Sequence, residues 1–314
     1  MKPIIYVDGA AGTTGLEIRE RLAGRSDIEL ISLSGNDRKD LAARSRVLNE
    51  ADIAILCLPD EAARESVASI RNPAVRVLDA STAHRAAPGW VYGFAELESG
   101  RREVIAAARH VSNPGCYPTG FLALVRPLVR AGVVPADYPL TVNAVSGYSG
   151  GGKAMIEEFE DDASPCFTRA VVRTYALALS HKHIPEMQIH GGLAHPPVFM
   201  PLVGRFYRGM LVEVPLQLWA LPGRPGVSDI FDVLAAAYAR EALVEVLAVD
   251  GAPATLDAEL MKDSDRMKLF VFGNETIGQV RLVAALDNLG KGAGGAGVQN
   301  LNLMLGVPET TGLR

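Results

Sequence analysis

An apolar strand that runs straight into a glycine-rich turn is the feature that most limits how this chain can fold. Ile4–Val7 is continuously apolar and rich in β-formers, which is typical of a strand buried on both faces. Small and hydroxylated residues follow it in a Gly-x-x-Gly-x-x-Gly pattern: Gly9, Gly12, Thr13, Thr14 and Gly15. A helical apolar spacing then begins at Leu16. Glycines between a strand and a helix let the backbone approach a pyrophosphate, so we expect these five residues to bind a dinucleotide; a purely structural turn is the alternative.

The second strand is predicted to end at the ribose of that dinucleotide. Glu29–Leu33 has strand character, and an NAD site usually places Asp or Glu directly after such a strand to hold the 2′-hydroxyl. Here the chain continues with Ser34, and the basic residues Arg38 and Lys39 follow. A small polar residue and two cations suit a 2′-phosphate, so we expect Ser34 and Arg38 to bind NADP(H). Asp37 leaves NAD open as an alternative, and the two cations could instead begin a solvated helix.

Further strands alternate with helices along the first third of the chain. Ile53–Leu58 and Val75–Asp79 are apolar and separated by a helical pattern, which predicts a parallel, doubly wound sheet. Pro59 ends the first of these strands, and we include it among the expected cofactor-binding residues. Arg85 follows the second strand, at the carboxyl edge where α/β proteins bind ligands. We expect it to hold a substrate carboxylate or phosphate; capping of a nearby carbonyl is the alternative.

A Pro-Gly turn followed by an apolar periodic run makes Cys116 a candidate nucleophile. The turn Asn113–Gly115 precedes the cysteine, and the run Phe121–Val125 predicts that Cys116 lies in the first turn of a helix. Such a position favours an anion, and the thiolate is the reactive form of cysteine. This stretch alone leaves a buried core cysteine equally open. Cys57 lies within an apolar strand and Cys166 has no helix start beside it, so neither is a candidate.

A glycine-rich loop after the strand Leu140–Val145 is a candidate anion site. The segment Ser146–Lys153 offers successive backbone N–H groups, two serine hydroxyls and one ammonium group. Its spacing differs from that of a Walker loop, and a flexible linker is the alternative. We expect Ser146, Gly147 and Lys153 to bind the substrate.

Two histidines and a carboxylate lie close together further along the chain, at His181, His183 and Glu186. A metal site is disfavoured because no third ligand follows at a convincing spacing. A histidine beside a thiol relays protons near neutral pH, and a carboxylate can orient it. We expect His183 to act as acid and base, with His181 and Glu186 at the substrate, although the sequence does not distinguish the two histidines. Surface histidines at the head of a helix are the alternative.

The chain ends in a second glycine-rich segment and an apolar helix. Asp287–Gly297 has the composition of a turn, and Val298–Leu305 that of a helix stopped by Gly306 and Pro308. The helix is too apolar to remain in water, so we expect it to pack on the first domain. This return would bring Asn288 near the cofactor, and we include it among the cofactor-binding residues.

The composition is that of a globular protein and argues against several classes of partner. The 314 residues are 48% hydrophobic and 21% charged, and the net charge of −5 disfavours nucleic acid and anionic membranes. No apolar run approaches the roughly 20 residues of a membrane span, and the N-terminus lacks a signal-peptide pattern. Three widely spaced cysteines form neither a disulfide framework nor a metal pattern. We therefore expect a cytoplasmic protein that acts on a small molecule without a metal.

Seven motifs along the chain gain meaning when they are taken together. They are Gly9-x-x-Gly12-x-x-Gly15, Asp79–Arg85, Tyr92–Leu97, Asn113–Thr119, Ser146–Gly150, His181-x-His183-x-Pro185-Glu186 and Asp287–Gly292. In this order they resemble the shorter-class N-acetyl-γ-glutamyl-phosphate reductases of arginine biosynthesis. The resemblance implies an α/β fold with an NADP-binding Rossmann-type domain (residues 1–115 with 292–314). It also implies an α+β catalytic and dimerisation domain (residues 116–291) of the semialdehyde-dehydrogenase and glyceraldehyde-3-phosphate-dehydrogenase type, in a homodimer or homotetramer.

The resemblance also implies covalent catalysis with NADP(H) as cofactor. The Cys116 thiolate would attack N-acetyl-γ-glutamyl phosphate and release phosphate, and NADPH would reduce the resulting thioester to N-acetylglutamate 5-semialdehyde. His183 would move protons, while Arg85 and the Ser146–Lys153 loop would hold the anionic ends of the substrate. Two alternatives stay open. One is the same chemistry on aspartyl phosphate or on carrier-bound aminoadipyl or glutamyl phosphate; the other is a non-catalytic NADP-binding redox regulator.

Overall fold

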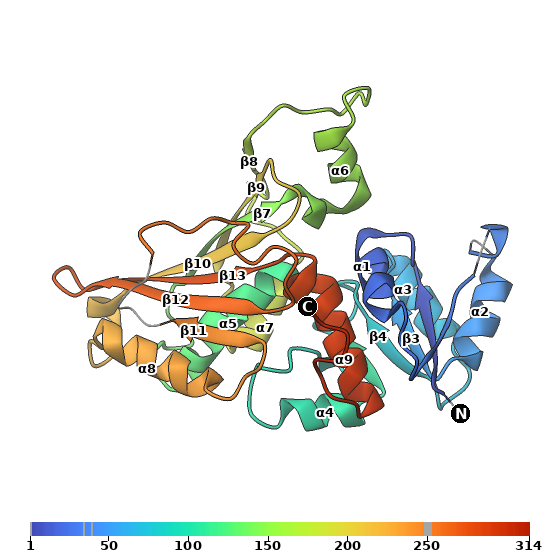
Figure 1. Cartoon of the computed structure of the whole chain (residues 1–314). Coiled ribbons are helices and arrows are strands. Elements are labelled where there is room, and N and C mark those ends of the chain that lie inside the picture. Colours follow the sequence, from blue (N-terminus) through green and yellow to red (C-terminus); the bar gives the residue numbers. More distant parts are fainter. Residues whose placement is uncertain (1, 34, 39, 248–252) are drawn as a thin grey trace. The chain divides into compact units, whose positions relative to one another are not determined.

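The computed structural model describes residues 2–33, 35–38, 40–247 and 253–314, and within it the chain forms two compact units. The first unit comprises Met1–Ala95, Gly100–Gly115 and Ala293–Leu313, and the second comprises Glu96–Ser99, Cys116–Gly292 and Arg314. Each unit contains its own sheet (Figure 1). Among the described residues, no helix is long and apolar enough to cross a membrane.

A sheet of six strands, counted over the described residues, forms the centre of the first unit. Its order is β2-β1-β3-β4-β6-β5, and every neighbouring pair is parallel. The strands are β1 (Ile4–Asp8), β2 (Glu29–Ile31), β3 (Ile53–Leu56), β4 (Arg76–Asp79), β5 (Val91–Tyr92) and β6 (His110–Ser112). The order of the strands reverses between β1 and β3, which is where such sheets bind dinucleotides. The predicted doubly wound, Rossmann-type sheet is confirmed.

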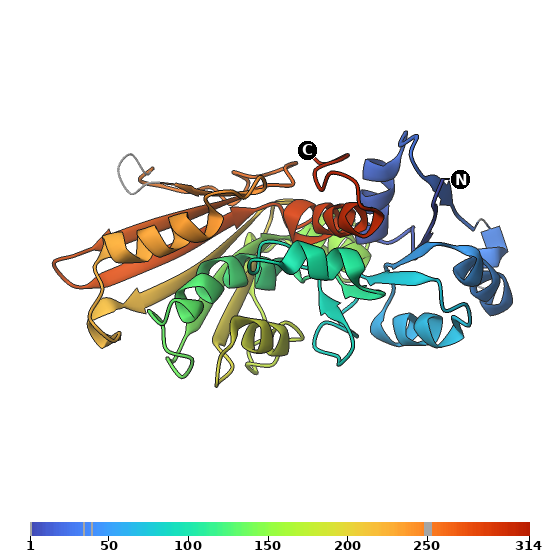
Figure 2. The ribbon, with the colours of Figure 1, turned by 90° about the horizontal axis from the view of Figure 1, so that it is seen from below.

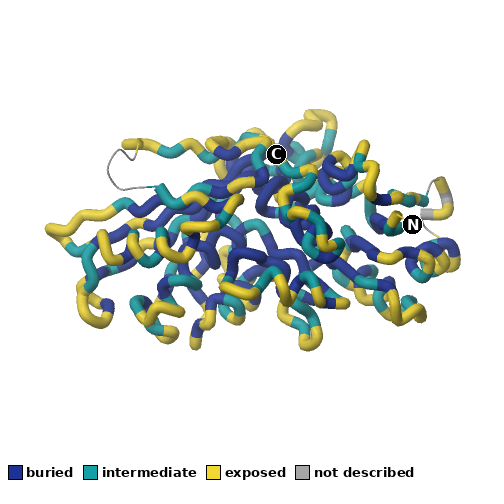
Figure 3. The backbone as a smooth tube through the Cα atoms, turned by 60° about the horizontal axis from the view of Figure 1, so that its bottom comes forward, coloured by how far each residue is buried: buried dark blue, intermediate teal, exposed yellow. Residues whose placement is uncertain are grey.

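Helices cover both faces of this sheet. One face carries α1 (Thr13–Leu22), α4 (Arg101–Ala107) and α9 (Gly295–Leu305), and the other carries α2 (Leu41–Glu50) and α3 (Asp60–Ser69), with a short 3-10 helix, η1 (Gly35–Arg38), before α2. In β1, Ile5 and Val7 pack towards the first set and Tyr6 towards the second. Both faces are buried, in keeping with the dark blue interior of the tube in Figure 3. This explains why β1 is apolar from Ile4 to Val7, before Asp8 at its end.

The second unit is built on a mixed sheet of seven strands within the described ranges. Its order is β11-β12-β13-β10-β7-β9-β8. The strands are β7 (Thr141–Gly147), β8 (Val172–Thr174), β9 (Val198–Gly204), β10 (Met210–Gln217), β11 (Val244–Leu247), β12 (Met267–Asn274) and β13 (Gln279–Leu286). The pairs β7–β9 and β11–β12 are parallel, and the others are antiparallel. The predicted α+β architecture of this part is confirmed.

One layer of helices covers one face of this second sheet, and α5 (Cys116–Arg130) lies at its centre. α5 packs on β10 and β13, with α7 (Ile184–Gly191) on one side and α8 (Val227–Tyr238) on the other (Figure 2). The Tyr238 hydroxyl donates to the Ala123 carbonyl at 2.9 Å and ties α8 to α5. Two 3-10 turns, η2 (Tyr148–Gly151) and η3 (Leu218–Ala220), and α6 (Gly152–Glu160) complete the unit. The position of α5 is therefore set by packing along its whole length.

The glycine-rich segment near the C-terminus is helical over most of its length, so its prediction as a turn through Gly297 was wrong. A π-helical turn, η4, spans Gly290–Gly294, and α9 starts directly after it at Gly295. Asp287 organises this start, because its carboxylate accepts the N–H groups of Leu289 at 2.8 Å and Gly290 at 3.2 Å. A glycine-rich composition predicts a loop only if the backbone N–H and C=O groups do not pair in a helix. In this segment they do pair in a helix.

The cofactor-type turn allows a matched test of packing. A Cβ on Gly15 would lie 2.5 Å from the Gly9 carbonyl oxygen, whereas a Cβ on Gly12 would meet no atom closer than 3.4 Å. Gly15→Ala should destabilise the protein by about 1–3 kcal/mol through overpacking, and Gly12→Ala should leave stability nearly unchanged. Thermal unfolding of both variants measures the difference. Equal melting temperatures would contradict the packing of Gly15 against Gly9.

Candidate active site

Cys116 is the first residue of α5, as the Pro-Gly turn predicted. Its side chain is half-buried. Every side chain from Phe121 to Val125 is at most 1% exposed, so the helix cannot shift without breaking the core. The first turn of a helix favours a negative charge, and this position therefore favours the thiolate form.

Aromatic side chains gather around the residue next to this cysteine. Tyr117 is buried, and its ring centroid lies near three others: Phe199 at 5.1 Å, His183 at 5.8 Å and His181 at 6.1 Å. The Tyr175 hydroxyl donates to the Tyr117 hydroxyl at 2.9 Å. Burial raises the pKa of Tyr117 well above its usual value and that of Tyr175 to about 12, with Cys116 contributing to both. Both phenols therefore remain protonated hydrogen-bond donors at neutral pH.

His181 is held as a neutral imidazole. Its Nδ1 accepts the backbone N–H of His183 at 3.1 Å, which places the ring proton on Nε2. Burial, together with the charge of Lys182, lowers the pKa of His181 to about 4. His183 itself precedes the first turn of α7 and is 6% exposed, and Glu186 in that turn is 1% exposed. The structure thus brings the two histidines together beside Tyr117. They form a largely buried pair and are not surface histidines at the head of a helix, which was the alternative.

The first part of the glycine-rich loop after β7 has its backbone N–H groups bonded within the second unit. The N–H groups of Gly147–Ser149 donate to carbonyl oxygens within Phe206–Gly209 at 3.0–3.1 Å, so they are already paired. The buried Ser146 hydroxyl donates to the Gly147 carbonyl at 3.1 Å, and Lys153 is exposed in the first turn of α6. The loop therefore packs tightly on the start of β10, and the expected substrate roles of Ser146, Gly147 and Lys153 stay predictions.

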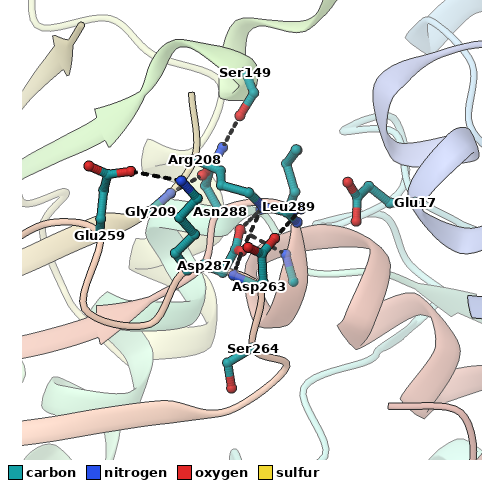
Figure 4. A network of polar contacts seen from close by, with 12 residues as sticks. Glu17, Ser149, Arg208, Gly209, Glu259, Asp263, Ser264, Asp287, Asn288 and Leu289 are labelled. Carbon is teal, nitrogen blue, oxygen red and sulfur yellow. Dashed lines mark hydrogen bonds and ion pairs between the residues drawn. The ribbon is translucent and has the colours of Figure 1, made fainter. Parts of the chain in front are cut away.

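Asn288 connects the end of β13 to this loop. It is buried, its Nδ2 donates to Ser149 Oγ at 2.9 Å, and its Oδ1 accepts the Gly209 N–H at 2.8 Å (Figure 4). Both ends of the amide are thus used to fix two backbone segments of the second unit. Its expected contact with the cofactor stays a prediction.

Sequence reasoning missed a charged pair beside Asn288. Asp287 is fully buried; its carboxylate lies 2.7 Å from Arg208 Nε in an ion pair and accepts the Asp263 N–H at 2.7 Å (Figure 4). Burial raises the pKa of Asp287, and Arg208 and the backbone donors oppose this shift. Arg208 precedes β10 and Asp287 follows β13, where Met210 pairs with Leu286. The pair exists only through strand pairing, so no local pattern could reveal it.

In the first unit, the glycine turn borders a pocket of about 200 Å³. The pocket is lined by Tyr6–Ala11, Arg19, Ser32, Leu33, Arg44 and Leu58. Gly9 has a φ of +79°, and a Cβ there would lie 2.2 Å from the Cys57 carbonyl oxygen, so only glycine fits. Thr13 Oγ1, at the start of α1, is buried and has no hydrogen-bond partner among the described residues. A hydroxyl at a helix N-terminus that has no hydrogen-bond partner among the described residues can donate to a phosphate group.

The other predicted cofactor-binding residues that the structure describes do not line this pocket. Gly12 is the N-cap of α1, Thr14 and Gly15 lie in its first turn, and Pro59 is the N-cap of α3 at the carboxyl edge of the sheet. Ser34 and the side chain of Arg38 lie outside the described residues.

Arg85 contacts backbone carbonyls in the structure. Its Nε donates to the Asn113 carbonyl at 2.9 Å and its Nη2 to the Ala80 carbonyl at 3.1 Å. The loop that carries it is fixed to β4, because the buried Asp79 carboxylate lies 2.6 Å from His84 Nδ1. These contacts correspond to the alternative of carbonyl capping, and a role of Arg85 at the substrate stays a prediction.

The other two cysteines lie in different surroundings from Cys116. Burial raises the pKa of Cys57 to about 12, with Asp79 and Asp8 adding to the shift, so this thiol stays protonated. Cys166 is exposed between α6 and β8. Within the part of the chain that the structure describes, no group of three or more His, Cys, Asp or Glu side chains could hold a metal ion.

Comparisons with known proteins define the class to which this fold and site belong. The semialdehyde dehydrogenase NAD binding domain matches residues 5–108, and the semialdehyde dehydrogenase dimerisation domain matches residues 116–288. A probable aspartate-semialdehyde dehydrogenase from Pseudomonas aeruginosa shares the fold with a TM-score of 0.73 at 17% identity, over 97% of this chain and 99% of its own. Aspartate semialdehyde dehydrogenase II of Vibrio cholerae has a TM-score of 0.72 at 14% identity, over 97% and 98%. The chain is a two-domain protein of the semialdehyde dehydrogenase class.

Curated relatives narrow this class to one family. The N-acetyl-gamma-glutamyl-phosphate reductase of Brucella anthropi is 55% identical over 98% of this chain and 99% of the relative. N-acetyl-gamma-glutamyl-phosphate reductase 2 of a Nostoc species is 51% identical over 99% of both chains. The chain belongs to the N-acetyl-γ-glutamyl-phosphate reductase family, as its motifs predicted.

The neutral His181 gives a prediction for the pH dependence of stability. Its pKa falls from 6.5 to about 4 on folding, so below about pH 6.5 the unfolded chain binds a proton that the folded chain does not. Stability should therefore decrease as the pH falls through this range. His181→Asn keeps an acceptor for the His183 N–H but has no titratable ring, so it should lose less melting temperature between pH 7.5 and 5 than the wild type.

The exposed His195 supplies the control, because His195→Asn should follow the wild-type curve. Identical pH dependence in the wild type and His181→Asn would show that His181 titrates normally in the folded protein.

Proposed function

We propose that this protein catalyses the NADPH-dependent reduction of N-acetyl-γ-glutamyl phosphate to N-acetylglutamate 5-semialdehyde and phosphate. The observation that carries this proposal is the half-buried thiol of Cys116 at the start of a fixed helix, directly beside an aromatic cluster that contains two histidines. Family membership supports the substrate, because the relatives are named for this reaction. The proposal also places the protein in arginine biosynthesis and in the cytoplasm.

Cys116 acts as the nucleophile. The thiolate attacks the acyl carbon, the bond to the phosphate oxygen breaks, and inorganic phosphate leaves an acyl thioester on the sulfur. The hemithioacetal formed on reduction then collapses, which releases the aldehyde and restores the thiolate. Division of the reaction in this way replaces one difficult step with two easier ones.

His183 is the residue we assign to proton transfer. His181 is unsuited to it, because its Nδ1 is occupied by the His183 N–H and its pKa of about 4 keeps it neutral. Neutral His181 can instead donate from Nε2 to a substrate oxygen. Glu186, buried in the first turn of α7, is assigned to orient this histidine pair.

We assign the cofactor to a domain of residues 1–115 with 292–314 and catalysis to residues 116–291. These domains correspond to the two units except at Glu96–Ser99, Gly292 and Arg314, which belong to the second unit. NADPH, when bound, supplies the hydride for the thioester.

The glycine turn and Thr13 are assigned to the phosphates of NADPH. A tight turn, a helix N-terminus and a buried hydroxyl that has no hydrogen-bond partner among the described residues meet there. Arg19 and Arg44 line the same pocket as Ser32. Asp8 of this pocket pairs with Arg44 at 2.8 Å, so the positive charge that supports NADP(H) over NAD is that of Arg19.

The second unit is assigned to assembly of a homodimer or homotetramer. Gly120 of α5 packs on Val212, so the next residue of β10, Glu213, points to the opposite face of the sheet. That face has a groove of about 560 Å³, whose lining includes Asn143, Glu213, Phe272 and Arg281. The name of the matching family domain, a dimerisation domain, supports this surface as the contact between copies. Sedimentation equilibrium of the full chain measures the number of copies.

Replacement of the nucleophile tests the mechanism. Cys116→Ser should lower phosphate-dependent NADP reduction with N-acetylglutamate 5-semialdehyde by at least about 1,000-fold, because the hydroxyl is a far weaker nucleophile. The affinity for NADPH, measured by fluorescence titration, should stay within about twofold of the wild type. Cys166→Ser is the matched control and should keep full activity. Substantial turnover by Cys116→Ser would exclude the covalent mechanism.

The substrate is tested by a direct comparison of semialdehydes. The fold is shared with aspartate-semialdehyde dehydrogenases, so aspartate semialdehyde is the closest competing substrate. The wild-type enzyme should show a kcat/KM for N-acetylglutamate 5-semialdehyde at least about 100-fold higher than for aspartate semialdehyde, with phosphate and NADP present. The reverse preference would assign the protein to the other substrate, and no turnover of either would favour the regulatory alternative.

A further inference from the structure

A lysine buried without exposed surface lies next to the active-site helix in the second unit. The side chains of Lys291 and Glu96 are 1% and 0% exposed, and Lys291 Nζ lies 2.7 and 2.9 Å from the two carboxylate oxygens. Lysine and glutamate are almost never buried to this extent unless they are paired. Glu96 belongs to the sequence motif Tyr92–Leu97, and Lys291 belongs to the motif Asp287–Gly292. The proposed reaction gives neither of these two charged side chains a role.

Stability does not account for such a pair. Removal of two charges from water costs several kcal/mol per ion, and their attraction often does no more than offset this cost. Apolar residues of similar volume are frequently as stable in the same place. The pair therefore points to a requirement for a defined geometry rather than for stability.

That geometry concerns the nucleophile. Lys291 lies within the π-helical turn Gly290–Gly294, and the next residue, Gly292, has its backbone against the cysteine. A Cβ on Gly292 would lie 2.9 Å from Cys116 Cβ and 3.3 Å from Cys116 Cα. Any shift of this turn is therefore passed directly to Cys116.

Two buried carboxylates hold the first residues of this turn. At its start, Asp287 accepts the N–H groups of Leu289 and Gly290, and the Gly292 N–H donates to the Asp287 carbonyl at 2.9 Å. Lys291, the second residue of the turn, is bound by Glu96. Asp287 is itself anchored by Arg208. Further along the turn, the Ala293 carbonyl accepts from Asn113 Nδ2 at 3.0 Å, so the Glu96 ion pair and this hydrogen bond tie this side of the turn to distant chain segments.

The segment that carries Glu96 is also fastened to α5. Glu98 pairs with Arg126 of α5 at 3.4 Å, with both side chains partly exposed. The charge of Glu96 contributes to the raised pKa of Tyr238, whose hydroxyl bonds to Ala123 of the same helix. Glu96 thus belongs to the packing around α5, while Lys291 belongs to the turn that contacts its first residue.

We propose that the buried Glu96–Lys291 pair positions Cys116 by holding the π-helical turn Gly290–Gly294 against the first turn of α5. Lys291 and Glu96 are positioning residues and do not touch the substrate. The inference rests on the proposed function only in taking Cys116 as the nucleophile. Loss of the pair should loosen the contact at Gly292, so that the thiol is no longer held in its reactive position.

The test uses Glu96→Leu with Lys291→Met, which removes both charges and keeps the approximate volume. The double variant should fold with a melting temperature close to that of the wild type, because no buried charge is left unpaired. Its kcat should fall by about 10- to 100-fold with little change in KM, since small misplacements of a reacting group have effects of this size. NADPH affinity should remain unchanged.

The second readout does not require the substrate. In a Cys166→Ser background, the rate of Cys116 alkylation by iodoacetamide is measured against pH in wild type and variant. The pH profile of the double variant should be displaced and its plateau rate changed, which a purely stabilising pair would not cause. This readout remains valid if the substrate assignment fails, so the two proposals are separable.

Glu245→Gln is the control, because it removes an ion pair of the exposed Glu245 with Lys268 elsewhere in the second unit and should leave kcat and alkylation at wild-type values. If the double variant does not fold, Glu96→Gln, which keeps one acceptor for Lys291, is measured in its place and should show a smaller change in the same direction. A folded variant with wild-type kcat and a wild-type alkylation profile would overturn the proposal.

Discussion

The burial of helix α5 is the constraint on which the second unit depends. Its apolar residues fill the space between the sheet and the neighbouring helices, and Gly120 brings the helix so close to β10 that a Cβ there would lie 2.8 Å from Val212. A helix packed in this way has no freedom to slide, so its first residue has a defined place. That residue is Cys116, and the core of the domain therefore fixes the position of the thiol for which we propose the role of nucleophile.

The titratable side chains near Cys116 are mostly neutral or paired with an opposite charge. Tyr117 and Tyr175 remain protonated because burial raises their pKa values, and His181 remains neutral because burial lowers its own. The buried charges of Glu96 and Lys291 neutralise one another. In surroundings of this kind a thiolate meets hydrogen-bond donors rather than competing anions, which suits a group that must attack a phosphorylated, anionic substrate.

Local patterns were sufficient wherever one element carried the whole signal. The strand Ile4–Val7 and the glycines after it predicted a Rossmann-type unit, and the turn before Cys116 predicted the start of α5; both were correct. In the loop Ser146–Lys153, the local pattern did not reveal that the N–H groups of Gly147–Ser149 bond to Phe206–Gly209, which lie far away in the sequence. The pairing of Asp287 with Arg208 escaped prediction for the same reason.

The sequence by itself determined the fold class and the family, and it predicted Cys116 as the nucleophile, because these follow from ordered motifs and from periodicity within single elements. Only the tertiary structure decided what surrounds that cysteine. It distinguished His181 from His183 through one backbone hydrogen bond, and it joined Glu96 to Lys291 beside Gly292. The physical reason is that burial, pKa shifts and close contacts depend on which distant segments pack together, and a linear pattern does not contain that information.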